Sequence, residues 1–227
     1  MVDWDSEPLM WDDPYGLVYI GGDLHPDTLL AAYRRGIFPW FNEDDPLLWW
    51  SPDPRAIFEF DKIHFSKRLL RTVRQGRFRT TMNCQFAGVM RACSDREEGS
   101  WITDDMFEAY CELHRLGHAH SVESWNGDEL VGGIYGVAVG GLFAAESMFH
   151  RETDAGMVAM VKLVEHLQSR GYILLDTQMA TDHTRILGAI DIPRDNYRRR
   201  LERAVALPVS FQAAGPDLRN ATPQHAG

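Results

Sequence analysis

The pattern of hydrophobic and polar positions changes character once along the chain. In the first part only one short helix is evident, with Pro26 suited to its first turn and Gly36 suited to its end. Leu29 and Tyr33 fall on one face of that helix. The segments "GIFPWF" and "LLWWSPDPRAIF" follow, and they are rich in proline and aromatic residues without a lasting period. We therefore predict a small N-terminal domain of loops and short elements over residues 1–62.

From residue 63 onward the pattern is that of regular helices and strands. It predicts helices over 66–75, over 86–93 and from Thr103 to about Gly117. Ser66 and Thr103 are suitable N-caps, because a side-chain oxygen there can accept a hydrogen bond from a free backbone N–H group. A fourth helix should begin after a cap at Thr153 and end at Gly171, and a basic helix should follow from about residue 194.

Strands occupy the stretches between these helices. The segments "AHSVESW" and "LVGGIYGVAVGGLFAAESMF" have the composition of strands, and the asparagine–glycine pair between them favours a hairpin turn. The apolar run over 173–175 forms another strand after the fourth helix. The order of hairpin, strand, helix and strand is the central arrangement of the acetyltransferase-like (GNAT) mixed sheet. We predict an α+β fold with a domain of this kind over residues 63–227.

Composition and charge limit the kinds of function. The chain has 227 residues, 44% hydrophobic and 25% charged, which is ordinary for a globular protein. No apolar run approaches the roughly 20 residues that span a bilayer, and the acidic N-terminus does not resemble a secretion signal. The three cysteines lack a C-x-x-C spacing, which favours reduced thiols. Together these features predict a cytoplasmic protein without a membrane segment. The formal net charge of −10 argues against broad, nonspecific binding to nucleic acid.

One segment departs from this acidic balance. Residues 62–79 contain seven cations and no acid. Within the helix predicted there, Lys67, Arg71 and Arg74 share one face, and Arg68 lies next to them in the sequence. Such a helix can contact phosphate groups. A solvated charged face would give the same pattern.

The most distinctive polar residues follow the strand over 173–175. Asp176 and Gln178 come directly after it, and because side chains alternate along a strand they should point to the same side. Glu146 and Ser147 end the neighbouring strand. We expect these groups to meet at the edge of an apolar cavity, where the carboxylate orients the amide and the amide holds an amine that attacks a carbonyl. The alternative is that Asp176 only caps a loop.

Other chemistries have less support in the sequence. No [Q/R]-x-x-G-x-[G/A] loop precedes the helix at 154–169, so coenzyme A is not expected. The sequence has no G-x-S-x-G elbow, and no carboxylate completes a metal site with His114, His118 and His120. We interpret His183 as a structural hydrogen-bonding residue. We therefore predict neither a cofactor nor a metal.

Several long segments resemble one family. The stretches "GGDLHPDTLLAAYRRGIFPWF", "WWSPDPRA", "SDREEGSWIT", "ELHRLGHAHSVE", "ELVGGIYGVAVGGLFAAESMF" and "DTQMATDHTRILGAIDIPRDNY" are similar to leucyl/phenylalanyl-tRNA–protein transferases, from about residue 21 to residue 197. This family moves leucine or phenylalanine from aminoacyl-tRNA to proteins with an N-terminal arginine or lysine, which marks them for N-end rule degradation. The resemblance also implies a small N-terminal domain followed by a GNAT-like domain.

The resemblance implies roles for particular residues. Gln178 would engage the acceptor amine and Asp176 would polarise it, or the pair would only position the reactants. Glu146 would face the acceptor, and Trp40 and Trp101 would hold the terminal adenosine by stacking on its base. The basic helix would contact the acceptor stem of the tRNA. The apolar pocket for the aminoacyl side chain would come from Ile134, Phe143, Met160, Leu163, Leu167 and Leu175.

The sequence leaves alternatives open. The family commonly has asparagine where this chain has Thr181, so a hydroxyl replaces a side-chain amide near the site. Pocket residues also differ from the family pattern, which leaves open the preference among leucine, phenylalanine and methionine. An acyl-CoA N-acyltransferase of the GNAT type is the alternative enzyme. A non-catalytic adaptor that binds tRNA ends or basic N-termini is the alternative from another class.

Overall fold

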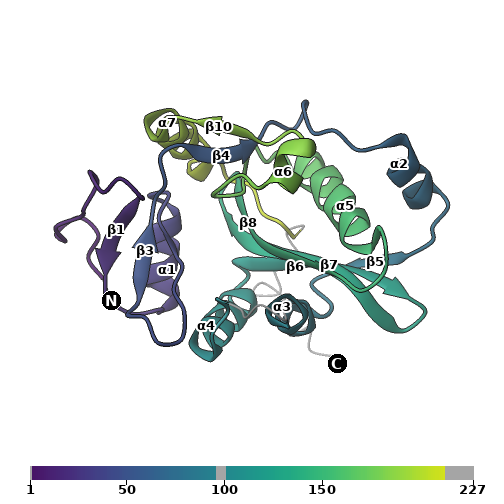
Figure 1. The fold of residues 1–227 in the computed structure, drawn as a ribbon, viewed down its shortest axis with the longest axis horizontal. Coiled ribbons are helices and arrows are strands. Elements are labelled where there is room, and N and C mark those ends of the chain that lie inside the picture. Colours follow the sequence, from purple (N-terminus) through teal and green to yellow (C-terminus); the bar gives the residue numbers. More distant parts are fainter. Residues whose placement is uncertain (1, 96–100, 213–227) are drawn as a thin grey trace, which may run out of the picture.

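The chain folds into a small sheet and a large sheet that lie side by side (Figure 1). The computed structural model describes residues 2–95 and 101–212. Residues 96–100, which fall within the segment "SDREEGSWIT", lie outside this description. Among the described helices, none combines the length and the apolar character needed to cross a membrane.

The small sheet belongs to the first 50 residues. Its three antiparallel strands are β1 (Leu17–Ile20), β3 (Leu48–Trp50) and β2 (Phe38–Pro39), in that order. The helix α1 (Pro26–Tyr33) precedes β2 and has Pro26 in its first turn, as predicted. Its residues Leu29 and Tyr33 are buried in the core. The predicted amphipathic helix is therefore confirmed, and it brings Tyr33 to the boundary with the large sheet.

The large sheet has seven strands in the order β10-β4-β9-β8-β7-β6-β5. Their bounds are β4 (Arg55–Phe58), β5 (Arg79–Met82), β6 (Ala119–Asn126), β7 (Glu129–Val139), β8 (Leu142–His150), β9 (Leu174–Asp176) and β10 (Ile190–Ile192). Among these described strands only the β8–β9 pair is parallel, so the sheet is mixed and the predicted α+β class is confirmed. The strand β4 precedes residue 62 and yet pairs within this sheet, and the division at residue 62 stays a prediction.

Helices cover both faces of the large sheet. Their bounds are α2 (Lys67–Arg74), α3 (Phe86–Ser94), α4 (Asp104–Arg115), α5 (Ala155–Arg170), α6 (Asp182–Ile186) and α7 (Arg194–Val205). Figure 1 shows α5 over one face and α3 with α4 over the other. The predicted caps are confirmed for two helices, since Ser66 Oγ accepts from the N–H group of Leu69 and Thr103 Oγ1 accepts from that of Met106.

The start of α5 differs from our prediction. Asp154, not Thr153, is the N-cap residue, and it has a left-handed conformation (φ 74°) without a side-chain capping bond. Its carboxylate instead forms an ion pair with Arg68 of α2, at 2.6 Å. A pairing partner far away in the sequence thus overrides the local capping preference. The predicted end is confirmed, because Gly171 terminates the helix in the left-handed conformation.

The order of elements around α5 builds the site. A hairpin of β6 and β7 is followed by β8, by the crossover helix α5, and by β9, which pairs in parallel with β8. Gly132 lets α5 approach β7 closely, because a Cβ atom there would lie 2.5 Å from the carbonyl carbon of Ala155. The parallel pairing ends at Ala144 and Asp176. Beyond this pair the two strands separate.

Candidate active site

Two cavities open where β8 and β9 separate. The first, which we call the side-chain cavity, has a volume of about 240 Å³ and is lined mainly by Phe58, Ile134, Met148, Met160 and Leu187, with His183 and Thr184 at α6. The second, the tryptophan cavity, has a volume of about 330 Å³ and is lined by Phe38, Pro39, Trp40, Trp101, Gln178 and Met179. Glu146, Thr177 and Thr181 line both cavities. These three residues therefore mark the junction.

The two tryptophans come from different parts of the chain. Trp40 follows β2 of the small sheet, and Trp101 precedes α4. The Trp50 indole N–H donates to the backbone oxygen of Trp40 at 2.6 Å, and the two rings meet edge to face at 5.9 Å. Trp40 remains 40% exposed, so its ring can receive a planar ligand. The predicted pair of aromatic residues is therefore brought together in one cavity.

Glu146 owes its position to a bulge in β8. Tyr135 of β7 pairs with Ser147, whereas the next residue, Gly136, pairs with Ala145, so Glu146 is the extra residue. Such a bulge re-aims a side chain and is frequent beside active sites. Our expectation that Glu146 and Ser147 end this strand was wrong, because β8 continues to His150. The bulge directs Glu146 to the junction of the two cavities.

The carboxyl group of Glu146 contacts Gln178 directly. Its Oε1 atom accepts hydrogen bonds from Gln178 Nε2 at 3.0 Å and from the Tyr33 hydroxyl at 2.7 Å. Burial raises the pKa of Glu146 to about 8, although the hydrogen bond from Tyr33 acts in the opposite direction. In these surroundings the carboxyl group is therefore largely protonated at neutral pH.

Asp176 lies behind the site and is fully buried. Arg55 donates to both of its oxygens, from Nε at 2.9 Å and from Nη2 at 2.6 Å. The Tyr197 hydroxyl donates to Oδ2 at 2.7 Å, and the backbone N–H of Gln178 donates to Oδ1 at 2.9 Å. All four bonds come from the protein itself. Asp176 lines neither cavity, so it acts on the site through the residues it holds and through its charge.

Gln178 does not continue the strand, and our alternation argument was wrong on this point. The strand β9 ends at Asp176, and Gln178 has a left-handed backbone (φ 56°), which is uncommon for a residue other than glycine. Asp176 holds its N–H group, and its carbonyl oxygen accepts from the N–H of Ala56 at 3.0 Å. This clamped turn directs the amide side chain to Glu146 while the Asp176 side chain stays buried. The alternative that Asp176 caps a loop describes part of its role.

The predicted pocket residues fall into two groups. Ile134 and Met160 line the side-chain cavity. The other four belong to the same apolar cluster, are fully buried and do not line the cavity: Phe143, Leu163, Leu167 and Leu175. Thr181 lines both cavities and is the N-cap of α6, where its Oγ1 accepts from the N–H of Thr184 at 3.2 Å. Asparagine and threonine are both favoured N-cap residues, so the change from the family pattern preserves this helix start.

Four residues of the site were not predicted from the sequence. Arg55 and Tyr197 hold Asp176, and Tyr33 reaches Glu146 from α1. The Tyr110 hydroxyl lies 2.5 Å from that of Tyr33. An arginine inside the apolar segment "RAIF" is the one local signal, because a buried cation requires a partner.

The predicted basic face lies at α2, on the far side of α5 from the small sheet (Figure 1). Lys67, Arg71 and Arg74 are exposed, and none of them has an ion-pair partner among residues 2–95 and 101–212. Arg68 differs, because both of its terminal nitrogens bind Asp154, at 2.6 and 2.7 Å. Its charge is thus balanced by a carboxylate at the N-terminus of α5, which leaves Arg68 less available to phosphate groups than the other three cations.

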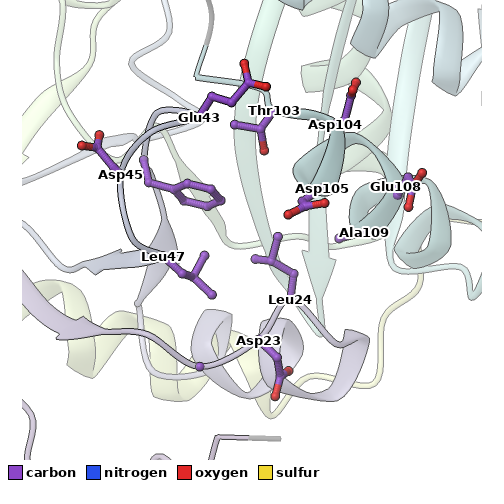
Figure 2. Close-up of a pocket in the computed structure, with 12 residues that line it drawn as sticks. Asp23, Leu24, Glu43, Asp45, Leu47, Thr103, Asp104, Asp105, Glu108 and Ala109 are labelled. Carbon is purple, nitrogen blue, oxygen red and sulfur yellow. The ribbon is translucent and has the colours of Figure 1, made fainter.

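A third cavity, of about 560 Å³, lies between the small sheet and α4 (Figure 2). Carboxylates surround it: Asp23, Glu43, Asp45, Asp104, Asp105 and Glu108. Two of these, Asp104 and Asp105, occupy the first turn of α4, where negative charge is favoured by the helix dipole. An acidic lining repels phosphate groups, so this cavity does not favour an anionic ligand.

Comparisons with known proteins point to one family. Family models described as leucyl/phenylalanyl-tRNA protein transferase match residues 57–202, and residues 22–53 match the model of its N-terminal domain. The solved structure of a GCN5-related N-acetyltransferase-like protein from Streptococcus suis is a weaker match, with 12% identity and a TM-score of 0.38 over 73% of this chain and 63% of that chain.

Curated relatives bear the name leucyl/phenylalanyl-tRNA–protein transferase. The one from Idiomarina loihiensis is 48% identical over 195 residues, which cover 85% of this chain and 83% of that protein. The one from Solidesulfovibrio magneticus is 52% identical over 196 residues, with 85% and 79% covered. The one from Escherichia coli O157:H7 is 51% identical over 202 residues, with 88% and 86% covered. The chain therefore belongs to the leucyl/phenylalanyl-tRNA–protein transferase family.

Proposed function

We propose that this enzyme transfers leucine or phenylalanine from aminoacyl-tRNA to the N-terminal arginine or lysine of acceptor proteins, which marks them for N-end rule degradation in the cytoplasm. One observation supports this most strongly. Gln178 and Glu146 contact each other at 3.0 Å at the junction of an apolar cavity and an aromatic one. The ester of leucine or phenylalanine with the terminal adenosine carries an apolar side chain and an aromatic base. It would occupy both cavities, and its carbonyl group would lie at their junction.

The ester fits this arrangement by its chemistry. The side-chain cavity is walled by apolar residues such as Ile134 and Met160, and it would exclude charged side chains because of their desolvation cost. The tryptophan cavity would hold the terminal adenine between Trp40 and Trp101, since base–aromatic stacking stabilises an unpaired base. The acyl–ribose bond would then lie beside Gln178.

The acceptor amine would approach the ester from the Gln178 side. Because Gln178 Nε2 donates to Glu146, the amide oxygen is left to accept a hydrogen bond from the amine. Asp176 acts as a positioning residue that fixes the backbone of Gln178. The junction would thereby place the amine near the ester carbonyl carbon, and positioning of this kind accounts for a large part of many rate accelerations.

A transfer assay with defined acceptors tests this proposal. We expect leucyl-tRNA to leucylate peptides that begin with arginine or lysine. The same peptides with an acetylated N-terminus, and a peptide that begins with glutamate, should remain unmodified. Mass spectrometry of the peptides measures the product. Transfer of an acetyl group from acetyl-CoA, or binding of leucyl-tRNA and arginine peptide without any product, would contradict the proposal.

The basic helix gives a second prediction, on tRNA affinity. Replacing Lys67, Arg71 and Arg74 together by alanine should weaken tRNA binding. The plot of log K against log salt has a negative slope, and its magnitude should decrease by about one for each phosphate group that the variant no longer neutralises. The matched control is Arg115→Ala, which removes an exposed cation already paired with Glu112 at 2.5 Å. Filter binding at several salt concentrations measures both. An unchanged slope in the triple variant would mean that α2 is only a solvated face.

A further inference from the structure

We propose that Glu146 takes the proton that the acceptor ammonium must lose, and that Tyr33 and Tyr110 are positioning residues that hold Glu146 for this step. This inference rests on the proposed function and deepens it. It assigns the proton to one side chain of the cavity junction. It also gives a role to two buried tyrosines on helices that belong to different parts of the fold.

The reaction requires a proton acceptor. An N-terminal amine is largely an ammonium group at neutral pH, and its nitrogen cannot attack until it has lost one proton. That proton passes to the Glu146 carboxylate, and the free amine forms a C–N bond with the ester carbonyl carbon. The C–O bond to the ribose then breaks, and the ribose oxygen leaves with the second amine proton as a hydroxyl group. Glu146 finally releases its proton to water.

Glu146 is the titratable group best placed for this role. Asp176 is fully buried, and four protein hydrogen bonds occupy its oxygens. The amide of Gln178 does not titrate. His183 lines only the side-chain cavity, where the leucyl group would lie. Glu146, in contrast, lines both cavities and contacts Gln178.

The two tyrosines form a buried hydrogen-bonded chain that ends on Glu146. Tyr110 of α4 and Tyr33 of α1 are 0% and 2% exposed. Their hydroxyl oxygens are 2.5 Å apart, and the Tyr33 hydroxyl donates to Glu146 Oε1 at 2.7 Å. Tyr33 thereby fills one lone pair of Oε1, and Gln178 fills another. The chain fixes the carboxyl group in one orientation and links α1 and α4 to the site.

The charged and titratable groups around Glu146 set the direction of its response. Asp176 of β9 disfavours its ionised form, whereas Tyr33 of α1 and Arg55 of β4 favour it, as does the amide of Gln178. The hydroxyl of Tyr110 is hydrogen-bonded to that of Tyr33. With its pKa raised to about 8, Glu146 is largely protonated at neutral pH, and a bound ammonium group would favour its ionised form.

Tyr33→Phe tests the chain because it removes one hydroxyl and keeps the ring. The variant loses a bond that favours the carboxylate, so the pKa of Glu146 should rise and the acid limb of the kcat/KM profile should move to higher pH. If the pKa rises by one unit, kcat/KM at pH values below the pKa falls about tenfold. Activity should return above the limb, which a general loss of structure would not allow.

Controls separate this effect from others. The acceptor peptide titrates identically with both enzymes, so a displaced profile belongs to the protein. Tyr172→Phe removes the hydroxyl of another buried tyrosine, outside both cavities, and should leave the profile unchanged. Tyr33→Phe/Tyr110→Phe avoids an unpaired buried hydroxyl if the single variant folds poorly. Superimposed profiles for wild type and Tyr33→Phe would overturn the inference.

A carbon NMR titration reads Glu146 without any transfer reaction. The resonance is assigned by its loss in Glu146→Gln, and its titration should move to higher pH in Tyr33→Phe. An enzyme that transfers leucine while neither the titration nor the profile moves would overturn this inference. A protein that transfers no leucine, yet shows the moved titration, would overturn the proposed function and leave the hydrogen-bonded chain supported.

Discussion

Replacing Asp176 with alanine is expected to lower the free energy of unfolding by about 3–5 kcal/mol, because it leaves a buried guanidinium group without its counter-ion. Arg55 and Asp176 form a bidentate pair at 2.6 and 2.9 Å, and each side chain is about 1% exposed. The same change removes the acceptor that holds the N–H group of Gln178. Transfer activity should therefore fall together with stability. Urea unfolding, compared with the wild type, measures the stability loss.

A matched variant separates charge from shape at this position. Asp176→Asn keeps the size of the side chain and an oxygen that can accept from Gln178, but it removes the charge that balances Arg55. Asp176→Asn/Arg55→Met removes the buried cation as well, and we expect it to recover part of the stability that Asp176→Asn costs. If Asp176→Ala unfolds with the wild-type free energy, the pair does not organise the site as described.

Replacing Gln178 with alanine is expected to lower kcat/KM for leucine transfer about a hundredfold, because the acceptor amine loses its positioning partner beside the ester. The change removes the hydrogen bond to Glu146 and leaves the Arg55–Asp176 pair intact. The affinity for leucyl-tRNA and the unfolding free energy should therefore stay close to the wild type. Single-turnover transfer at saturating leucyl-tRNA measures the effect.

The control for this variant is Gln168→Ala, which removes an exposed glutamine from α5. It should transfer leucine at the wild-type rate. Wild-type turnover in Gln178→Ala would show that the amide has no part in the reaction. A parallel loss of tRNA affinity would instead place Gln178 among the groups that bind the donor.

Local patterns in the sequence predicted the elements well where one segment decides its own structure. The caps at Ser66 and Thr103 depend on hydrogen bonds within a single helix turn, and the structure has both. The start of α5 was mispredicted because Asp154 responds to Arg68, a residue 86 positions away. Capping preferences cannot include such a partner.

The candidate site shows the same contrast between features that depend on local sequence and features that depend on distant contacts. Asp176 and Gln178 were found because polar residues at the end of a buried strand are conspicuous, whereas Glu146 was found as a polar residue in an apolar segment that continues as β8 to His150. Their geometry was not predictable, since Glu146 depends on a bulge in β8 and Gln178 depends on a left-handed turn. Tyr33 lies 113 positions from Glu146, and no periodic pattern in the sequence connects them. Contacts between distant segments therefore decide the details of the site.

The central claim is that amine and ester meet at the junction of the two cavities. A crystal structure with leucyl-adenosine, its ester replaced by a stable amide, and an arginine-initiated peptide tests this most directly. We predict adenine between Trp40 and Trp101, the leucyl side chain against Ile134, and the peptide amine within hydrogen-bonding distance of Gln178 and Glu146. The account would be contradicted if the leucyl-adenosine bound outside these cavities, or if the amine bound away from Gln178.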